Sequence, residues 1–312
     1  MKKHLCMTCI AAFLLLTGCN SAAKTDGTYI NINGTYNFND DFRNDPDTAI
    51  SKVLAETDPE PSDTISLENG KFTITQNRTA NITYTWSGVY SFENAALKFS
   101  YTDVNNTAEA GRITKLNETG AYPSAIMPRI YLADAAKTAS RMPLALLRDS
   151  QAPAVTETHG DFLCTPLFGL TVDGSYQSGK DFALEYVPAD TLRNDKYSLA
   201  YFNEAEQCYA AQYDEEKLGM QIKILANRYG IGSPEAMQFR VQCAGGKWEM
   251  TANNGQAVSK GAYAESKTHP GFIVMYEEPD DPASAGILQN IYPLFLYIDG
   301  NQIYYPGFVR KE

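Results

Sequence analysis

The sequence predicts an all-β fold made of two antiparallel β-meander modules, with short helices in the connections. The first observation is the stretch Glu68–Asp103, where apolar and polar residues alternate and Asn69-Gly70 supplies a hairpin turn. The second is the return of short alternating runs from Phe162 onward, which end in a tight hairpin at 299–301. The third is how little of the chain has helical periodicity.

The first predicted module covers residues 27–121. It opens on an alternating strand at Gly27–Phe38, followed by an Asn- and Asp-rich loop at 39–47, a short helix at Thr48–Glu56 and a Pro-containing turn at 58–63. The remaining predicted strands are Ile65–Leu67, Lys71–Thr75, Ile82–Trp86, Val89–Phe92, Ala96–Tyr101 and Arg112–Leu116. The aromatic core candidates are Phe72, Trp86, Tyr90 and Phe99.

Residues 122–160 are predicted to connect the modules, because prolines interrupt them and only Tyr131–Met142 has room for a helix of modest length. The second predicted module covers residues 161–312. Its predicted strands are Leu170–Val172, Phe182–Val187, Tyr197–Phe202, Gln207–Tyr213, Gly219–Ala226, Met237–Cys243, Lys247–Thr251, Gly261–Ala264, Phe272–Tyr276, Leu294–Ile298 and Ile303–Phe308.

Short sequence matches link the two modules. Glycine at turns, aromatic residues facing a core and threonine facing water are what two copies of one antiparallel module would retain. Residue usage common to all β-meanders is the alternative explanation. The matched segments are Gly70–Thr75 with Gly246–Thr251, Gly88–Tyr90 with Gly261–Tyr263, Gly34–Tyr36 with Gly174–Tyr176, and the strand-ending residues Tyr101 with Tyr276.

The N-terminus predicts export and lipid attachment. Two lysines precede the apolar run Ile10–Leu16, which is too short to span a bilayer as a helix. Leu-Thr-Gly-Cys then follows at 16–19 and resembles the lipobox of bacterial lipoproteins. The resemblance implies that residues 1–18 are a signal peptide, that Cys19 is acylated, and that residues 19–26 are a lipidated tether. A secretory signal with a chance cysteine is the alternative.

Charge and the residue after Cys19 bear on partners and location. Without the signal peptide, 24 Lys and Arg face 37 Asp and Glu, a formal charge of −13. Nucleic acid binding needs a basic surface, and an acidic one does not attract anionic lipid, so the predicted membrane partner is reached through the N-terminal acyl chains. In enterobacterial lipoproteins, an Asp directly after the lipidated cysteine is associated with retention in the inner membrane. This chain has Asn20 at that position, so the resemblance implies the outer membrane.

Three cysteines, Cys164, Cys208 and Cys243, remain in the body of the protein. In an oxidising envelope an odd number predicts one disulfide and one buried thiol. Cys208 and Cys243 are the predicted pair, since both lie in strand-like runs of the second half. The mature chain has no Cys-x-x-Cys, so neither a redox pair nor a zinc ribbon is predicted.

The body of the chain also resembles lipocalin-like domains of bacterial lipoproteins. A Gly- and Tyr-containing first strand precedes NGKFTIT, WSGVYSF and LKFSYT, and the resemblance covers residues 27–116 and, more faintly, 170–308. It implies small antiparallel barrels or sandwiches, often with an internal cavity. The usual lipocalin G-x-W near the start is absent, since Gly34-Thr35-Tyr36 carries Tyr at that place.

Gly174–Lys180 has the G-x-x-x-x-G-K spacing of a phosphate-binding loop. Asp181 stands where the magnesium-binding Ser or Thr belongs, and a strand-like segment follows in place of a helix. We therefore predict a turn between strands, with no nucleotide cofactor.

The mature chain has two histidines, His159 and His269, both in loop-like stretches. His159 is close in sequence to Asp161 and Cys164, a possible thiol–imidazole pair, but such partners usually meet across the fold. G-x-S-x-G is absent. Exposed loop histidines are the favoured interpretation, and no catalytic residue is assigned.

Acidic loops at 39–47 and 277–281 could offer oxygen ligands to calcium, but neither has EF-hand spacing, so solvated loops are favoured and no metal site is predicted. The many Tyr and Phe side chains could line a sugar groove, although a β-rich core explains them too. Tyr304-Tyr305-Pro306 is the aromatic cluster that looks most exposed.

The leading functional hypothesis is a lipid-anchored envelope lipoprotein at the cell surface or in the periplasm. Its role would be non-enzymatic binding or assembly, with an envelope protein or a small apolar or glycan molecule as partner. The alternative is a surface hydrolase that cleaves glycan or peptidoglycan through paired carboxylates, which the sequence does not identify.

Overall fold

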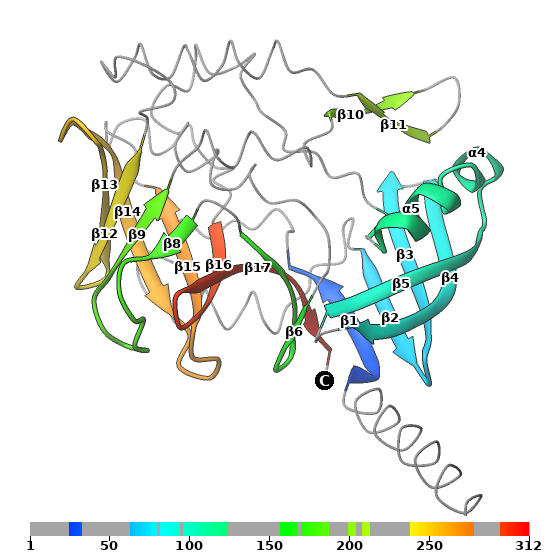
Figure 1. Ribbon diagram of the computed structural model, residues 1–312, viewed down its shortest axis with the longest axis horizontal. Helices are drawn as coiled ribbons and strands as arrows, with labels where there is room; N and C mark the ends of the chain where they lie inside the picture. The colour runs from blue at the N-terminus through cyan, green and yellow to red at the C-terminus, as the bar shows by residue number, and fades with distance from the viewer. Residues whose placement is uncertain are drawn as a thin grey trace, which may run out of the picture.

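The structure is an all-β body, as predicted, and its main sheet has fifteen strands (Figure 1). The computed structural model describes residues 25–32, 63–79, 82–93, 96–120, 122–123, 157–167, 170–186, 199–203, 208–212, 238–277 and 294–311. The predicted helices at 48–56 and 131–142 and the predicted strand at 219–226 lie outside these residues.

The strands of the main sheet are β1 (Gly27–Asn31), β2 (Thr64–Glu68), β3 (Lys71–Thr79), β4 (Ile82–Glu93), β5 (Ala96–Val104), β6 (Glu157–His159), β7 (Phe162–Pro166), β8 (Leu170–Val172), β9 (Phe182–Tyr186), β12 (Phe239–Ala244), β13 (Lys247–Ala252), β14 (Ala257–Glu265), β15 (Phe272–Glu277), β16 (Leu294–Asp299) and β17 (Gln302–Arg310). A separate two-stranded sheet pairs β10 (Leu199–Asn203) with β11 (Cys208–Gln212).

The main sheet closes into two barrels. In the first barrel, antiparallel ladders run from β1 through β2, β3, β4, β5, β6 and β7 to β17, and β17 pairs with β1 again. The second barrel runs through β8, β9, β12, β13, β14, β15, β16 and β17. Contacts between β8 and β17 complete it, next to a hydrogen bond of 2.8 Å from the Leu167 N–H to the Ile303 carbonyl.

The strand β17 belongs to both barrels. One of its edges pairs with β7, while the other pairs with β16 at 302–304 and with β1 at 308–310. A β-bulge between Pro306 and Phe308 marks the change from one barrel to the other. The sheet topology therefore places two strands in the first barrel that were not predicted there: β6, at the end of the predicted connection at 122–160, and β7, in the predicted second module.

Equivalent residues show that the two barrels repeat one strand plan. Phe72 lies opposite Gly88 in the β3–β4 ladder, and Trp248 lies opposite Gly261 in the β13–β14 ladder. A Cβ on either glycine would stand about 2 Å from a carbonyl oxygen of the next strand and within 3 Å of the opposing ring. Both barrels thus use glycine to let an aromatic ring lie flat on the sheet.

The turns before β3 and β13 are held in the same way. Asp26 accepts a hydrogen bond from the Asn69 N–H at 3.1 Å, and Asp181 accepts one from the Gly245 N–H at 3.2 Å. Asp26 immediately precedes β1, which pairs with β2, and Asp181 immediately precedes β9, which pairs with β12. These matches in register and in capping support an internal duplication.

The ribbon of β7 and β17 shows how the two copies are joined. The registers of the β6–β7 and β16–β17 hairpins make residue 162 equivalent to residue 302, so Thr165 is equivalent to Tyr305, and these two equivalent residues pair with each other. An approximate twofold axis therefore passes through the ribbon. The last strand of each copy continues past this axis and helps to close the barrel of the other copy.

One of the predicted equivalences is not tested by the structure, and another is corrected by it. Gly34–Tyr36 lies outside the described residues. Val89 pairs with Ser100 and Ala262 pairs with Tyr276, so the counterpart of Tyr276 is Ser100 and not Tyr101. The two ladders therefore place Tyr101 and Tyr276 one position apart, so the two tyrosines are not equivalent residues.

The predicted strand at Arg112–Leu116 is wrong. The short helix α4 (Thr107–Ala110) follows β5, and the helix α5 (Ile113–Thr119) covers the predicted strand. Among the described residues β5 pairs with β6 only at Ala96–Glu157, which leaves an edge to be covered. The Asn117 side chain, from α5, accepts from the Tyr101 N–H at 2.6 Å and donates to its carbonyl at 3.0 Å.

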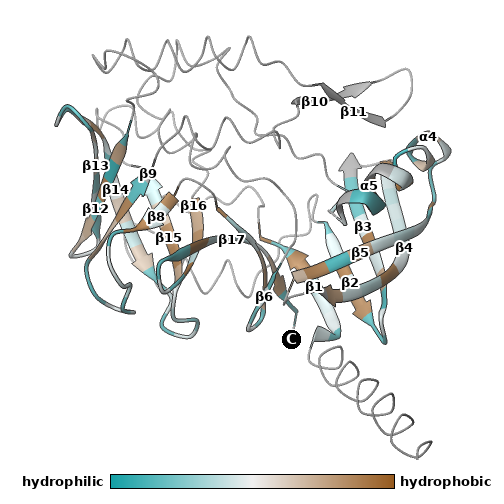
Figure 2. Ribbon diagram, in the orientation of Figure 1, coloured by the Kyte–Doolittle hydropathy of each residue, from teal (hydrophilic) through white to brown (hydrophobic). Residues whose placement is uncertain are grey.

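Apolar and polar residues alternate along the strands of the two barrels (Figure 2), and the apolar side chains pack in the barrel interiors. The four predicted aromatic core residues of the meander are all buried in the first barrel. The first core includes Tyr29, Ile65, Phe72, Ile74, Tyr84, Trp86, Phe99, Tyr101, Leu163 and Phe308. The second includes Leu170, Leu184, Val241, Cys243, Trp248, Met250, Met275, Leu296 and Ile303. A third cluster, on the opposite face of β7, β15, β16 and β17, includes Phe162, Phe272, Tyr276 and Phe295.

Candidate functional site

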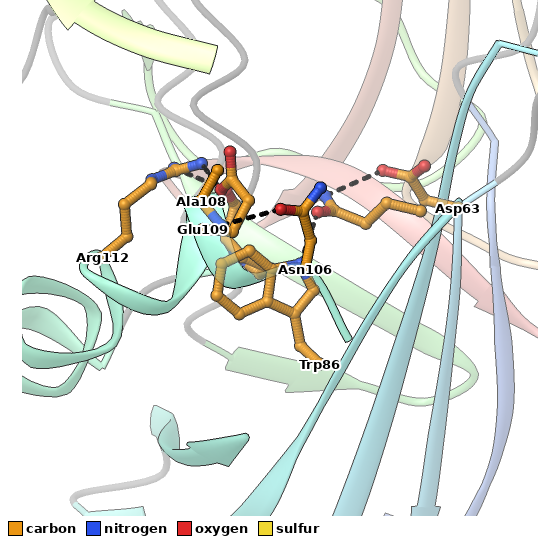
Figure 3. A network of polar contacts seen from close by, with 8 residues as sticks. Asp63, Trp86, Asn106, Ala108, Glu109 and Arg112 are labelled. Atoms are coloured by element: carbon orange, nitrogen blue, oxygen red, sulfur yellow. Dashed lines mark hydrogen bonds and ion pairs between the residues drawn. The ribbon is translucent and has the colours of Figure 1, made fainter. Parts of the chain in front are cut away.

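The first barrel contains a buried chain of polar side chains beneath α4 and α5 (Figure 3). The Trp86 indole N–H donates to Gln76 Oε1 at 2.8 Å, and Gln76 Nε2 donates to Asp63 Oδ2 at 3.4 Å. The Tyr122 hydroxyl donates to the same Asp63 oxygen at 2.7 Å. All four side chains are nearly inaccessible to solvent. The carboxylate of Asp63 is therefore held as a hydrogen-bond acceptor inside the barrel.

An ion pair lies on the other side of the indole. Arg112, at the junction of α4 and α5, donates to the Glu109 carboxylate and to the Pro123 carbonyl, the latter at 2.8 Å. Its guanidinium carbon is 5.8 Å from the centroid of the Trp86 ring, a cation–π distance. The Glu109 side chain is fully buried and that of Arg112 is 28% exposed. The pair thus closes one end of the barrel, with the guanidinium nearest to solvent.

Comparison of the two barrels singles out this polar network, formed by Asp63, Gln76, Trp86, Glu109, Arg112 and Tyr122. By the register that matches Phe72 with Trp248, the counterparts of Asp63, Gln76 and Trp86 are Phe239, Ala252 and Ser259. A closed barrel of this plan therefore forms without the network. Because buried polar groups and ion pairs cost desolvation energy, the first barrel retains a feature that folding does not require. It is our strongest candidate for a functional feature among the described residues.

His269 lies in the loop between β14 and β15, as predicted, and is half-buried, whereas His159 is not the exposed loop residue that the sequence predicts. His159 lies on β6 with its side chain only 15% exposed, and its Nε2 atom is 3.0 Å from Glu157 Oε2. Its Nδ1 atom is 4.0 Å from Asp299 Oδ2, and its ring centroid is 4.2 Å from that of Tyr304. His159 is half-buried because its ring packs against Tyr297 and Tyr304 of the β16–β17 hairpin.

The second histidine reaches the same aromatic cluster from a distant part of the sequence. The ring of His269 is 5.2 Å from that of Phe162, and Tyr297 lies 5.9 Å from Phe162 and 5.3 Å from His159. Cys164 is buried nearby, and burial followed by the charge of Glu157 raises the pKa of its thiol well above the usual range. The thiol stays protonated at neutral pH, so a thiol–imidazole nucleophile is not supported.

The loop at Gly174–Lys180 is a turn between β8 and β9, as predicted. Its backbone N–H at Gly179 donates to Glu265 at 2.5 Å, and the Ser178 hydroxyl donates to the same carboxylate at 2.6 Å. The Gly271 N–H donates to it at 2.8 Å. The donors that could surround a phosphate therefore hold a carboxylate of the protein itself.

Replacing Glu265 with glutamine is expected to lower stability at pH 7 by about 1 kcal/mol. Burial alone would raise the pKa of Glu265, but hydrogen bonds from Ser178 and the backbone lower it below the ordinary 4.5. Such a carboxylate stabilises the fold above its unfolded-state pKa and loses that effect as pH falls through the lower folded-state value. Urea unfolding between pH 7 and pH 3 should therefore show a steeper acid loss in wild type than in Glu265→Gln. Equal acid slopes would contradict this role.

The remaining predicted sites are the disulfide, the exposed aromatic cluster and the two acidic loops. Cys243 is a free, buried cysteine in the core of the second barrel, so the predicted Cys208–Cys243 disulfide is not present. The Cys243 side chain faces the packed interior of the second barrel, whereas Cys208 lies on β11 of the separate sheet. Tyr304 and Pro306 are buried and Tyr305 is half-buried, since both edges of β17 are paired. The acidic loop at 39–47 and residues 278–281 lie outside the described residues.

Three further findings bear on the site. Within the described ranges no group of three or more His, Cys, Asp or Glu side chains is arranged to hold a metal ion. No helix in the same ranges is long and apolar enough to cross a membrane. No family model, curated protein or solved structure matches this chain, so the interpretation depends on its own residues.

Proposed function

We propose that this chain is a lipid-anchored cell-envelope protein with a non-enzymatic binding or assembly role. The observation that carries the proposal is the filling of both barrels by their own side chains, aromatic ones in particular. Where the interior is packed, a partner is met by the outer surface, which fits a binding or assembly role better than enclosure of a small ligand. The proposed partners are an envelope protein or a glycan.

The start of the body supports anchoring. Thr25 is buried and Asp26 accepts hydrogen bonds from the Tyr90 hydroxyl at 2.6 Å and from the Asn69 N–H. The described body therefore includes Thr25 and Asp26, the last two residues of the predicted tether, and Thr25 lies six residues after Cys19. An acyl chain on Cys19 would hold such a body next to the bilayer, and we place it at the outer membrane on the evidence of Asn20.

The hydrolase alternative needs two facing carboxylates at an open cleft. The buried carboxylates of the first barrel, Asp63 and Glu109, are each engaged in hydrogen bonds inside the network. Neither is placed to protonate a leaving group or to activate water on an external polymer. They give this alternative no support.

Replacing Cys19 with alanine is expected to move the protein from the membrane fraction to the soluble fraction, because the acyl attachment point is lost. Fractionation of cells that express each form, followed by immunoblotting, measures this. Ser21→Ala is a matched control that changes the same segment and should stay in the membrane fraction. Membrane retention of Cys19→Ala would contradict the anchor.

A further inference from the structure

The tether enters the first barrel at a defined corner. Asp26 bonds both to the Asn69 N–H of the β2–β3 turn and to the Tyr90 hydroxyl of β4. The Tyr90 N–H in turn donates to the Gly70 carbonyl at 2.9 Å. The entry point, the β2–β3 turn and the middle of β4 are therefore one rigid unit, which we call the entry corner (Asp26, Asn69–Lys71 and Val89–Tyr90).

The length of the tether limits how far this corner can lie from an acylated Cys19. Six Cα–Cα steps separate Cys19 from Thr25. Whatever its conformation, such a segment spans at most about 22 Å, since an extended chain advances no more than about 3.6 Å per residue. A lipid anchor would keep the entry corner within that distance of the bilayer surface.

An independent observation points to the same corner. Val89 is 49% exposed and is the large hydrophobic side chain that stands out as exposed among the described residues. It pairs with Lys71 across the β3–β4 ladder, so an apolar side chain and an ammonium group lie side by side on the outer face. This combination suits the boundary between lipid headgroups and acyl chains, where lysine can direct its charge to phosphate. A shallow hollow beside it is lined by Ser66, Glu68, Asn69, Lys71, Phe72 and Thr73.

We propose that the entry corner lies against the lipid surface, with Val89 and Lys71 at the headgroup level. This inference rests on the proposed acylation of Cys19 and adds an orientation to it. Thr83, which pairs with Asn77, lies six residues before Val89 on β4, roughly 20 Å away. The end of the barrel that carries Thr83 and the nearby helix α4 then faces away from the membrane (Figure 1).

The test uses the full-length acylated protein in vesicles of phosphatidylethanolamine and phosphatidylglycerol that contain a spin-labelled lipid quencher. A small fluorophore is attached at Lys71→Cys or, as the matched control, at the exposed Thr83→Cys of the same hairpin. Cys208→Ser is present in both, and Cys164 and Cys243 are buried and remain unlabelled. We expect the label at 71 to be quenched several-fold more strongly than the label at 83.

Equal quenching at both positions, or stronger quenching at 83, would overturn the orientation. The behaviour of Cys19→Ala distinguishes a wrong orientation from a failed lipid anchor. If the protein stays with the vesicles and Cys19→Ala does not, weak quenching at 71 rejects only the orientation. If Cys19→Ala also stays with the vesicles, the proposed lipid anchor is wrong, and the tether no longer limits the distance between the entry corner and the bilayer.

Discussion

Replacing Phe308 with alanine is expected to open the first barrel, although Phe308 lies on the last strand of the chain. Its side chain is buried among first-barrel residues and its ring centroid is 5.1 Å from that of Tyr122. Loss of a buried phenylalanine costs about 3–5 kcal/mol because a cavity remains. Hydrogen exchange followed by mass spectrometry should show faster exchange in β1 to β5, with β12 to β15 changed little.

Ile303→Ala is the matched control, because it lies five residues earlier on the same strand but faces the second barrel. We expect a loss of about 2–5 kcal/mol and faster exchange in β12 to β15 instead. If both variants loosen the same set of strands, the division of β17 between the barrels is wrong.

Replacing Arg112 with methionine is expected to destabilise the protein by about 3 kcal/mol. Methionine keeps much of the side-chain volume, so the main change is that the buried Glu109 carboxylate loses the guanidinium charge. The cation–π contact with Trp86 is lost as well. Chemical unfolding at pH 7, followed by the fluorescence of the two tryptophans, measures the free energy of unfolding.

The double variant Arg112→Met/Glu109→Leu separates a charge effect from a packing effect. Removing both charges leaves apolar side chains of similar size, and such replacements of buried ion pairs are often neutral or stabilising. We expect the double variant to recover most of the stability lost in Arg112→Met. A double variant as unstable as Arg112→Met would show that the lost stability does not come from the unpaired Glu109 charge. The conclusion that the barrel can fold without the network would then be wrong.

Much of the fold is predictable from local patterns. The alternation in Ala96–Tyr101 predicts one buried face, and Leu97, Phe99 and Tyr101 are indeed buried. The Asn69-Gly70 turn is formed, with positive φ at both residues. Arg112–Leu116 fails because a short mixed run does not distinguish a strand from a helix, and the choice depends on the exposed edge of β5.

Little of the candidate site could be predicted. Asp63, Gln76 and Glu109 stand in a turn, a strand and a short helix, and no spacing connects them. A polar residue at an inward position of a strand, such as Gln76 two residues after Ile74, was the one available signal. The sequence does not predict the histidine cluster either, because its members are far apart in the chain. His159 contacts Tyr297, Tyr297 contacts Phe162, and Phe162 contacts His269.

By itself, the sequence determines the strands, their buried faces and the tight turns, because these depend on neighbours within a few residues. It also carries the lipobox-like segment on which the proposed anchor depends. Only the tertiary structure decides which strand edges pair. The bond from Arg310 to Tyr29 joins residues 281 positions apart, and β17 divides its edge between β16 and β1. Such pairings depend on the closing of both barrels at once, which no local pattern records.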